Sequence, residues 1–356
     1  MSGRIDVGLL GATGTVGTWL AHMLEGHPWF RLAEVGASPG SVGRPYGQAA
    51  ALDGLPGGVA LSDRVLGLAL KSSGGEWSSP VLLSALPSAE AGPVEEELCR
   101  RGHVVVSNAA SHRLDPDVPL IIPEVNADHL ALVAHQQGRW PGVLVTNPNC
   151  SVVGLALALA PLHRTFGVRA VAVTTLQALS GAGRPGPSAA DMLDNVLPQI
   201  AGEEQKLAAE PQKILGELEG EGVRCAKFPV SAQAHRVPVS HGHLLAVSVK
   251  LARLAGLDDV VAAMAGFRGA VTDERLPTAP ERAIEVVEDV TRPQPRLDRD
   301  RGDGMTITVG RVRACETLDV KFAALVHNLV RGAAGAALLN AELCHRAGHI
   351  AGARAR

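Results

Sequence analysis

A strand-like segment that runs directly into three evenly spaced glycines constrains the fold of this chain more than any other feature. Residues 5–10 are largely apolar, Gly11, Gly14 and Gly17 follow, and a helical pattern covers residues 18–24. In such a turn the first glycine allows a tight bend, the second lets the backbone approach a pyrophosphate, and the third lets the helix pack closely on the strand. The segment therefore predicts the first strand and helix of a dinucleotide-binding sheet. An ordinary strand-to-helix turn is the alternative.

Strand patterns recur through the first half of the chain, and most of them end at polar residues. The predicted strands cover residues 31–37, 81–87, 103–108 and 143–146, and a helix covers 90–101. Ser84, Asn108, Arg113 and Cys150 lie at or after the ends of these strands. Because ligands bind beyond the carboxyl ends of strands in open α/β sheets, we expect these side chains along one rim of a doubly wound sheet.

Cys150 stands between a predicted strand and the apolar helical run 151–162. A cysteine at a helix N-terminus meets backbone N–H groups and the positive end of the macrodipole. Both favour a thiolate, so the position predicts a lowered pKa and a nucleophilic cysteine. The alternative is a small buried apolar residue, which is how most free cysteines behave.

β-Branched and alternating runs dominate the second half of the chain, with few helices between them. Strands are expected at residues 168–179, 223–239, 244–252, 283–290, 305–312 and 318–326. This arrangement predicts an α+β unit with a mostly antiparallel sheet. A polar, helix-like stretch is expected over 191–220 and a charged surface loop over 298–304. A final helix over 331–345 is expected to pack back on the first unit.

The loop after the second predicted strand bears on the choice of cofactor. An NAD enzyme usually has a carboxylate there to bind the ribose 2′-OH, whereas this loop carries Ser38, Ser41 and Arg44. Glu34 lies in mid-strand, too early for that role. Small hydroxyls and an arginine tolerate a 2′-phosphate, so the loop favours NADP over NAD. The two serines could instead simply form a turn.

A second group of chemically active residues, Arg236, His241 and His243, lies in the second half. An arginine can hold a carboxylate bidentately, and a histidine can transfer a proton near neutral pH. His241 and His243 would share one face of a strand, which also suggests a metal pair. No third ligand stands near them in the sequence, so we expect no metal. An ordinary hydrogen-bonded histidine is the alternative for His243.

Composition excludes several classes of protein. A chain of 356 residues suggests two domains, and its net charge of −3 favours neither nucleic acid nor an anionic membrane. The apolar runs are shorter than a membrane span requires, and the strand pattern that begins at Ile5 predicts no signal peptide. Five scattered cysteines without a C-x-x-C pair argue against disulfides and zinc and for the cytoplasm.

Taken in order, the motifs resemble those of the aspartate-β-semialdehyde dehydrogenase family, and most closely its archaeal and fungal branch. The resemblance spans nearly the whole chain. It rests on residues 11–17, 107–113, 147–151, Gln177 with 180–183, 203–206, 236–239 with Gly242 and His243, and 327–328 with 331–335.

The resemblance implies a role for each candidate residue. The implied roles are Cys150 as nucleophile, His243 as its acid/base partner, Gln177 to orient the acyl group with Asn149 near the acyl oxygen, Arg236 for the substrate α-carboxylate, Glu203 for its α-amino group, Arg113 and Lys206 for phosphate, and Asn328 beside the nicotinamide. The implied cofactor site comprises Gly11, Thr13, Gly14, Thr15, Val16, Gly17, Ser38, Ser41, Arg44, Ser84 and Asn328. Glu203 has an alternative role as an exposed ion partner of Lys206.

The resemblance also implies an α/β architecture and a reaction. A Rossmann-like doubly wound domain would comprise residues 1–149 plus 329–356, and an α+β catalytic and dimerisation domain residues 150–328. The homodimer or homotetramer would reduce L-aspartyl 4-phosphate reversibly to L-aspartate 4-semialdehyde with NADPH, for lysine, threonine and methionine biosynthesis. Cys150 would displace phosphate to form a thioester, and hydride transfer would give a thiohemiacetal that collapses with help from His243.

Two departures from the family pattern and three rival functions remain. The branch tends to have an arginine where this chain has Gly40, so Arg44 is a candidate substitute, and the loop 182–187 is unusually rich in Gly and Pro. N-acetyl-γ-glutamyl-phosphate reductase usually has glycine where Asn149 stands, and malonyl-CoA reductase would not need Glu203 to bind an amino group. A nucleotide-binding redox sensor would have Cys150 oxidised instead of acylated. The joint presence of Cys, His, Arg and Gln argues against a sensor.

Overall fold

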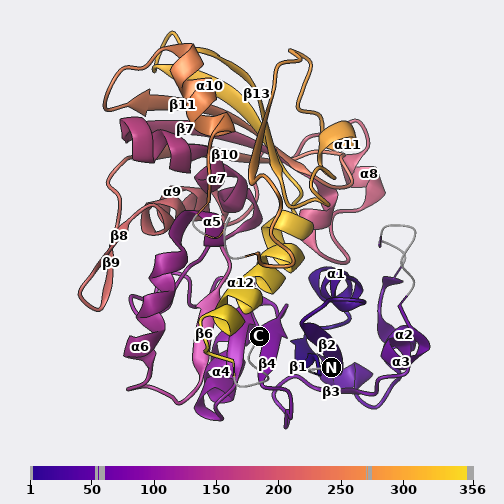
Figure 1. Ribbon diagram of the computed structural model, residues 1–356. Coiled ribbons are helices and arrows are strands. Elements are labelled where there is room, and N and C mark those ends of the chain that lie inside the picture. The colour runs from indigo at the N-terminus through magenta and orange to yellow at the C-terminus, as the bar shows by residue number, and fades with distance from the viewer. Residues whose placement is uncertain (1–2, 53–54, 56–60, 270, 272–274, 351–356) are drawn as a thin grey trace.

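The protein is built on two six-stranded sheets, which lie in the lower and upper halves of Figure 1. The structure is a computed structural model that describes residues 3–52, 55, 61–269, 271 and 275–350. The ends of the first expected domain, residues 1–2 and 351–356, therefore lie outside the described residues. Across the described ranges, no helix is both long enough and apolar enough to cross a membrane.

The N-terminal sheet is entirely parallel, with strand order β3-β2-β1-β4-β5-β6. Its strands are β1 (Ile5–Leu10), β2 (Phe30–Ala37), β3 (Leu70–Ser72), β4 (Val81–Ser84), β5 (Val104–Ser107) and β6 (Val143–Thr146). The order reverses between β1 and β4, and such a switch point is where ligands bind in doubly wound sheets. The sequence did not predict the short edge strand β3.

Helices cover both faces of this sheet. Helices α1 (Thr15–Leu24) and α12 (Gly335–Arg346) pack on the face that carries Leu83 and Val106. Helix α4 (Ser88–Arg100) packs on the opposite face, against their chain neighbours Leu82 and Val105. This alternation follows from the two-residue period of a strand. The doubly wound prediction is confirmed, as is the expected return of the C-terminal helix.

The glycine turn after β1 has the predicted geometry. Gly11 adopts a φ of +68°, a left-handed conformation that side chains disfavour. A Cβ atom on Gly17 would lie 2.3 Å from the carbonyl oxygen of Gly11. Helix α1 can therefore begin at Thr15, immediately beyond the end of the strand.

The second sheet is mixed, with strand order β10-β7-β11-β14-β13-β12. Its strands are β7 (Val168–Gln177), β10 (Val230–Arg236), β11 (His243–Leu251), β12 (Ile284–Val287), β13 (Ile307–Ala314) and β14 (Val320–Val326). The three central pairings are antiparallel, and the β10–β7 and β12–β13 pairings at the edges are parallel. The predicted strand over 223–239 is split in two, since only β10 joins this sheet.

One face of the second sheet packs on α7 (Cys150–Phe166), α9 (Glu203–Ile214) and α10 (Leu257–Ala265). Its other face carries small and polar residues such as Thr174 and Ser248, which are partly exposed. Shorter elements connect the main ones: α2 (Tyr46–Ala49), α3 (Asp63–Leu66), α5 (Pro123–Asn126), α6 (Val133–Gln136), α8 (Ala189–Met192), α11 (Pro295–Asp298), β8 (Glu217–Glu219), β9 (Gly222–Arg224), η1 (Pro39–Ser41), η3 (Ala127–Leu132), η4 (Leu179–Ala182) and η6 (Val330–Ala334).

Two predictions about loops and helices need correction. The polar stretch 191–220 is helical mainly in α9, because the chain before Glu203 forms turns. The expected surface loop at 298–304 begins with a buried residue, Asp298, which accepts hydrogen bonds from the side chains of Arg292 and Arg301. Its charge is neutralised inside the fold, which a count of charged residues could not reveal.

Candidate active site

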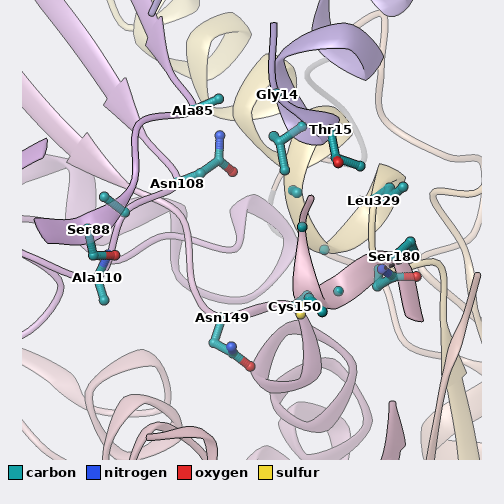
Figure 2. A pocket seen from close by; sticks show the side chains of 18 of the residues that line it. Gly14, Thr15, Ala85, Ser88, Asn108, Ala110, Asn149, Cys150, Ser180 and Leu329 are labelled. Atoms are coloured by element: carbon teal, nitrogen blue, oxygen red, sulfur yellow. Dashed lines mark hydrogen bonds between the residues drawn. The ribbon is translucent and has the colours of Figure 1, made fainter. Parts of the chain in front are cut away.

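A cavity of about 560 Å³ lies where the carboxyl edge of the parallel sheet meets the start of α7. Figure 2 shows Gly14 and Thr15 of α1 on one side of it and Asn149 and Cys150 on the other. The candidate residues that line it are Gly14, Thr15, Val16, Arg113, Asn149, Cys150, Gln177, Glu203, Lys206 and Asn328. They come from both halves of the chain.

Cys150 is the first residue of α7, and Asn149 is the helix N-cap. The side-chain oxygen of Asn149 accepts hydrogen bonds from the backbone N–H groups of Ser151 and Val152 at 3.0 and 3.3 Å. The cysteine packs against η6, where a Cβ atom on Gly332 would lie 2.6 Å from that of Cys150. The cap and this close packing fix the backbone that carries the thiol.

The carboxylate of Glu203 joins three polar residues at the base of the cavity. It accepts hydrogen bonds from Asn149 Nδ2 at 2.9 Å, Gln177 Nε2 at 3.0 Å and Lys206 Nζ at 2.9 Å. Burial alone would raise the pKa of Glu203, but Lys206 and the two amide donors outweigh it and hold the pKa below its usual value. The ion pair with Lys206 that the alternative predicts is present, but Glu203 is only 7% exposed, so it is a buried partner and not an exposed one.

Arg113 forms a buried ion pair that the sequence did not predict. Its Nη1 donates to Glu210 Oε1 at 2.9 Å, and its Nη2 donates to the carbonyl oxygen of Asn108 at 2.6 Å. The other oxygen of Glu210 accepts the backbone N–H of Asn149 at 2.7 Å. Glu210 lies seven residues after Glu203, on the same face of α9, and that spacing was the available sequence signal.

Arg236 and His243 lie behind the cavity and do not line it. Arg236 Nη1 donates to the carbonyl oxygen of Ala178 at 2.7 Å, and His243 Nδ1 accepts the N–H of the same residue at 3.0 Å. A Cβ atom on Gly181 would lie 2.9 Å from the guanidinium and 3.0 Å from the imidazole. A side chain at position 181 would therefore push against this pair, whereas glycine leaves space between the pair and the cavity.

His241 and His243 do not share a strand face as predicted. His243 begins β11, whereas His241 lies in the preceding turn and stacks on His327 with ring centroids 5.8 Å apart. Within the part of the chain that the structure describes, no group of three or more His, Cys, Asp or Glu side chains could hold a metal ion.

Burial dominates the protonation of the two reactive groups. It raises the pKa of Cys150 to about 12, with a further increase from Glu203, although Arg113 and Arg236 act against it. Burial also lowers the pKa of His243 to about 3, assisted by Arg236. Burial thus acts against the lowered thiol pKa that the helix N-terminus predicts, and it favours a thiol and a neutral imidazole near neutral pH.

The start of α1 presents an open anion site. Gly14 is its exposed N-cap, no side chain caps the helix, and its first turn has no acidic residue. The first N–H groups of a helix have no partner within it, and they attract phosphates. Asn328 lies across the cavity, where its Nδ2 donates to Ser180 Oγ at 2.9 Å and its Oδ1 accepts from the N–H of Gly242 at 2.8 Å.

The remaining cofactor candidates lie in contrasting surroundings. Ser38 and Arg44 are exposed beyond β2, with the partly exposed Ser41 between them, and none of the three lines the cavity. Ser84 is fully buried beside Glu95 of α4, so its side chain does not reach the cavity. Thr13 is partly exposed in the glycine turn but does not line the cavity either.

Asn108, which was expected at this rim, also lines the cavity, together with residues to which the sequence assigned no role. The latter are Ala85, Leu86, Pro87, Ser88, Ala109, Ala110, Pro148, Ser180, Gly181, Ala182, Gly183, Arg184, Leu329, Gly332 and Ala333. Most are small or apolar residues in turns, which carry no chemical signal in a sequence.

Family models match most of the chain. A model described as "Semialdehyde dehydrogenase, NAD binding domain" matches residues 6–133. A model described as "Semialdehyde dehydrogenase, dimerisation domain" matches residues 159–331. The first region covers strands β1 to β5 of the parallel sheet, and the second covers all the strands of the mixed sheet.

Individual proteins match over nearly the full length. An aspartate-semialdehyde dehydrogenase of the archaeon Archaeoglobus fulgidus is 44% identical and covers 96% of this chain and 98% of its own. A malonyl CoA reductase (NADP) of Metallosphaera sedula is 37% identical and covers 98% and 99%. The crystal structure of an aspartate semialdehyde dehydrogenase with NADP from the fungus Candida albicans superposes with a TM-score of 0.89 at 37% identity, covering 96% and 99%. These matches confirm the predicted resemblance, and the chain belongs to the semialdehyde dehydrogenase family.

Proposed function

We propose that the protein catalyses the reversible, NADP-dependent reductive dephosphorylation of L-aspartyl 4-phosphate to L-aspartate 4-semialdehyde. The observation that carries the proposal is the buried Glu203 carboxylate, which bonds Asn149 beside Cys150. A buried carboxylate at a cysteine nucleophile is suited to a substrate that brings an ammonium group. The close aspartate-semialdehyde dehydrogenase relatives support the same substrate.

NADP fits the surroundings of the cavity. The uncapped start of α1 suits a pyrophosphate, and Ser38, Ser41 and Arg44 suit a 2′-phosphate. Glu34 cannot bind a ribose hydroxyl, because Lys71 and Ser79 already occupy its carboxylate. When bound, the nicotinamide supplies or accepts the hydride. The relative solved with NADP supports this choice of cofactor.

The substrate is held by charges of opposite sign. Arg236 binds its α-carboxylate and Glu203 its α-ammonium group, while Arg113 and Lys206 bind the phosphate. Gln177 and Asn149, both held by Glu203, orient the acyl group toward Cys150. Lys206 forms an ion pair with Glu203 in this structure. When substrate binds, this pair is replaced by two, one between Glu203 and the α-ammonium group and one between Lys206 and the phosphate.

Cys150 attacks the acyl carbon, and the carbon–oxygen bond to phosphate breaks to leave a thioester; the thiol proton leaves with the departing phosphate. Because His243 Nδ1 accepts the N–H of Ala178, its neutral ring carries the proton on Nε2. That atom is buried and has no hydrogen-bond partner among the described residues. It donates to the acyl oxygen when reduction places negative charge there. Collapse of the thiohemiacetal then breaks the carbon–sulfur bond and releases the aldehyde.

Two parallel assays test this function. Purified protein should reduce NADP⁺ with L-aspartate semialdehyde only when phosphate is present, and should show little reduction with malonate semialdehyde and CoA. Because a malonyl CoA reductase is among the similar proteins, CoA-dependent activity is the alternative function that the second assay tests. Faster CoA-dependent turnover, or none in either assay, would contradict the proposal.

The assembly and location follow from the same family. We propose a homodimer or homotetramer formed through the second domain, as the matched dimerisation model supports, and a cytoplasmic location, as five free cysteines support. The proposed domains are residues 1–149 with 329–356, and 150–328.

A further inference from the structure

Helix α9 presents four charged residues along one face, at positions 203, 206, 210 and 213. Spacings of three and four residues place such side chains in a row. The row alternates in charge, and three of its members are buried. Glu203 and Lys206 have roles in the proposed reaction, whereas Glu210 and Lys213 do not yet have one.

Glu210 links two segments that meet at the cavity. One carboxylate oxygen accepts Nη1 of Arg113 at 2.9 Å, and the other accepts the backbone N–H of Asn149 at 2.7 Å. Glu210 is 2% exposed and Arg113 is 6% exposed. One rigid side chain thereby joins the proposed phosphate-binding guanidinium to the residue immediately before the nucleophile.

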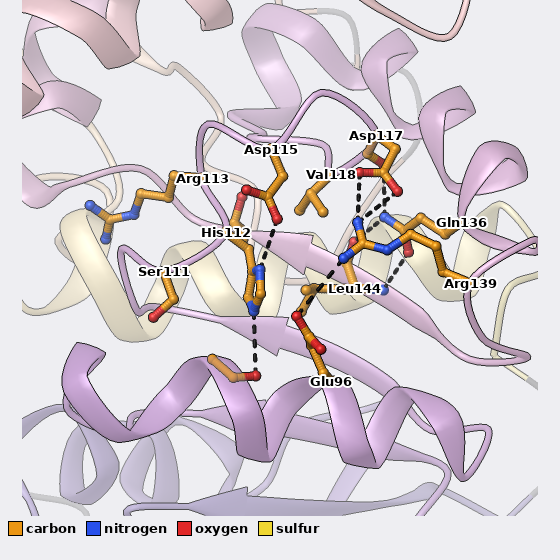
Figure 3. A network of polar contacts seen from close by, with 12 residues as sticks. Glu96, Ser111, His112, Arg113, Asp115, Asp117, Val118, Gln136, Arg139 and Leu144 are labelled. Carbon is orange, nitrogen blue, oxygen red and sulfur yellow. Dashed lines mark hydrogen bonds and ion pairs between the residues drawn. The ribbon is translucent and has the colours of Figure 1, made fainter.

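The side chain of Lys213 anchors the main chain of Arg113 and of the residues that follow it. Its Nζ donates to the carbonyl oxygens of Arg113, Asp115 and Val118 at 2.9, 2.6 and 2.7 Å. Figure 3 shows the side chain of Arg113 extending away from the neighbouring pair of His112 and Asp115. Arg113 is therefore held by α9 at both its backbone and its guanidinium.

We propose that Glu210 is a positioning residue that sets the placement of the Arg113-bound phosphate relative to the sulfur of Cys150. The inference rests on the proposed function, in which phosphate leaves from or attacks the acyl group on that sulfur. Such a step depends on the alignment of the two reacting groups. A common anchor for Arg113 and Asn149 supplies that alignment before any ligand binds.

The bridge requires a carboxylate of this length. Both partners are donors, and a glutamine has one acceptor oxygen, so Glu210→Gln can keep only one of the two bonds. Glu210→Asp retains the charge but is one methylene shorter, so it cannot span both partners from the same backbone. Glu204→Gln is the matched control, because it removes the same charge from the same helix, and among the described residues the one hydrogen bond that Glu204 accepts comes from the N–H of Ala234, at 3.2 Å.

The experiment compares these three variants with the wild type in the oxidative direction. Both Glu210 variants should lower kcat/KM for phosphate by about tenfold or more. The KM for NADP⁺ and the rate of the first-turnover NADPH burst should stay within about threefold of wild type, as should all constants of Glu204→Gln. A purely structural role would instead lower kcat and the amplitude of the burst in the same proportion through loss of folded enzyme, with the KM for phosphate unchanged, and circular dichroism would register that loss.

Two results would overturn the inference. One is a kcat/KM for phosphate within about threefold of wild type in Glu210→Gln. The other is restoration of that constant in Glu210→Asp, which would mean that the charge alone suffices. The proposed function itself is tested first, by measuring phosphate-dependent turnover of the wild-type protein. If that turnover is absent, the proposed function is wrong, and this result is distinct from any result with the Glu210 variants.

Discussion

The two ends of the ligand site are built differently. At the nucleophile, Asn149, Glu203 and Glu210 are 7%, 7% and 2% exposed, and each makes at least two hydrogen bonds. Beyond β2, Ser38 and Arg44 are exposed, and Arg44 is hydrogen-bonded to the carbonyl oxygen of Gln48 at 3.0 Å. The end of the site near Cys150 is therefore held in place by hydrogen bonds before a ligand binds, whereas the end at Ser38 and Arg44 faces solvent.

This difference sets how much each end contributes to catalysis. A buried charge left without its partner costs several kcal/mol, whereas an exposed contact is weakened by water and salt. Substitutions should therefore have large, coupled effects near Cys150 and small, separable ones near Arg44.

Cys150→Ser should lower kcat by about 10³-fold or more, because a serine hydroxyl has a far higher pKa than a thiol. NADPH binding, measured by fluorescence titration, should be nearly unchanged, since the match to an NAD binding domain covers residues 6–133 and does not include Cys150. Residual activity within about tenfold of wild type would show that another group is the nucleophile.

Alkylation of Cys150 by iodoacetamide should accelerate about 100-fold from pH 7 to pH 9 without reaching a plateau, because only the thiolate reacts. Burial holds its pKa near 12, so the thiolate fraction keeps rising with pH. Cys315 is the internal comparison, since a hydrogen bond from Thr317 lowers its pKa to about 7 and its rate should level off. Peptide mass spectrometry distinguishes the two sites. A plateau for Cys150 below pH 8 would contradict the dominance of burial.

Glu203→Gln should reduce the preference for aspartate semialdehyde over succinate semialdehyde by about tenfold or more, near 1.4 kcal/mol. The second aldehyde lacks the amino group that the carboxylate is proposed to bind. Activity on both should also fall, because Asn149 and Gln177 lose an ionised acceptor. Glu204→Gln serves as the control. An unchanged ratio of kcat/KM values would exclude amine recognition by Glu203.

Arg44→Ala should raise the KM for NADPH about fivefold and leave that for NADH nearly unchanged, since an exposed contact to a 2′-phosphate is worth about 1 kcal/mol. The effect should shrink at high salt. Arg31→Ala, which removes another exposed arginine of the same region, is the control. Equal effects on both cofactors would mean that Arg44 does not bind the 2′-phosphate.

The sequence allowed prediction of the features that depend on local pattern. The glycine turn with its strand and helix, the two kinds of sheet and the returning helix α12 all follow from periodicity. The cavity brings together most candidate residues because their motifs lie at the ends of elements that the pattern already located.

What could not be predicted depends on contacts between distant segments. Arg113 and Glu210 are separated by 97 positions, and neither has a neighbour that reveals the other. Ser84 ends a strand as expected, yet its side chain turns toward the buried Glu95 of α4. The protonation of Cys150 could not be predicted for a related reason, because a helix N-terminus is visible in a sequence and burial is not.

The packing of η6 against Cys150 has a consequence for synthesis on the ribosome. Gly332 forms part of the wall around a nucleophile that is translated 182 residues earlier, and α12 covers a face of a sheet whose strands are complete by Thr146. A nascent chain that stops short of residue 330 therefore exposes the apolar surface of β4 and β5 and lacks one side of its reactive centre. The reactive centre can therefore be completed only after the C-terminal segment has been synthesised, and limited proteolysis of stalled chains should detect this step.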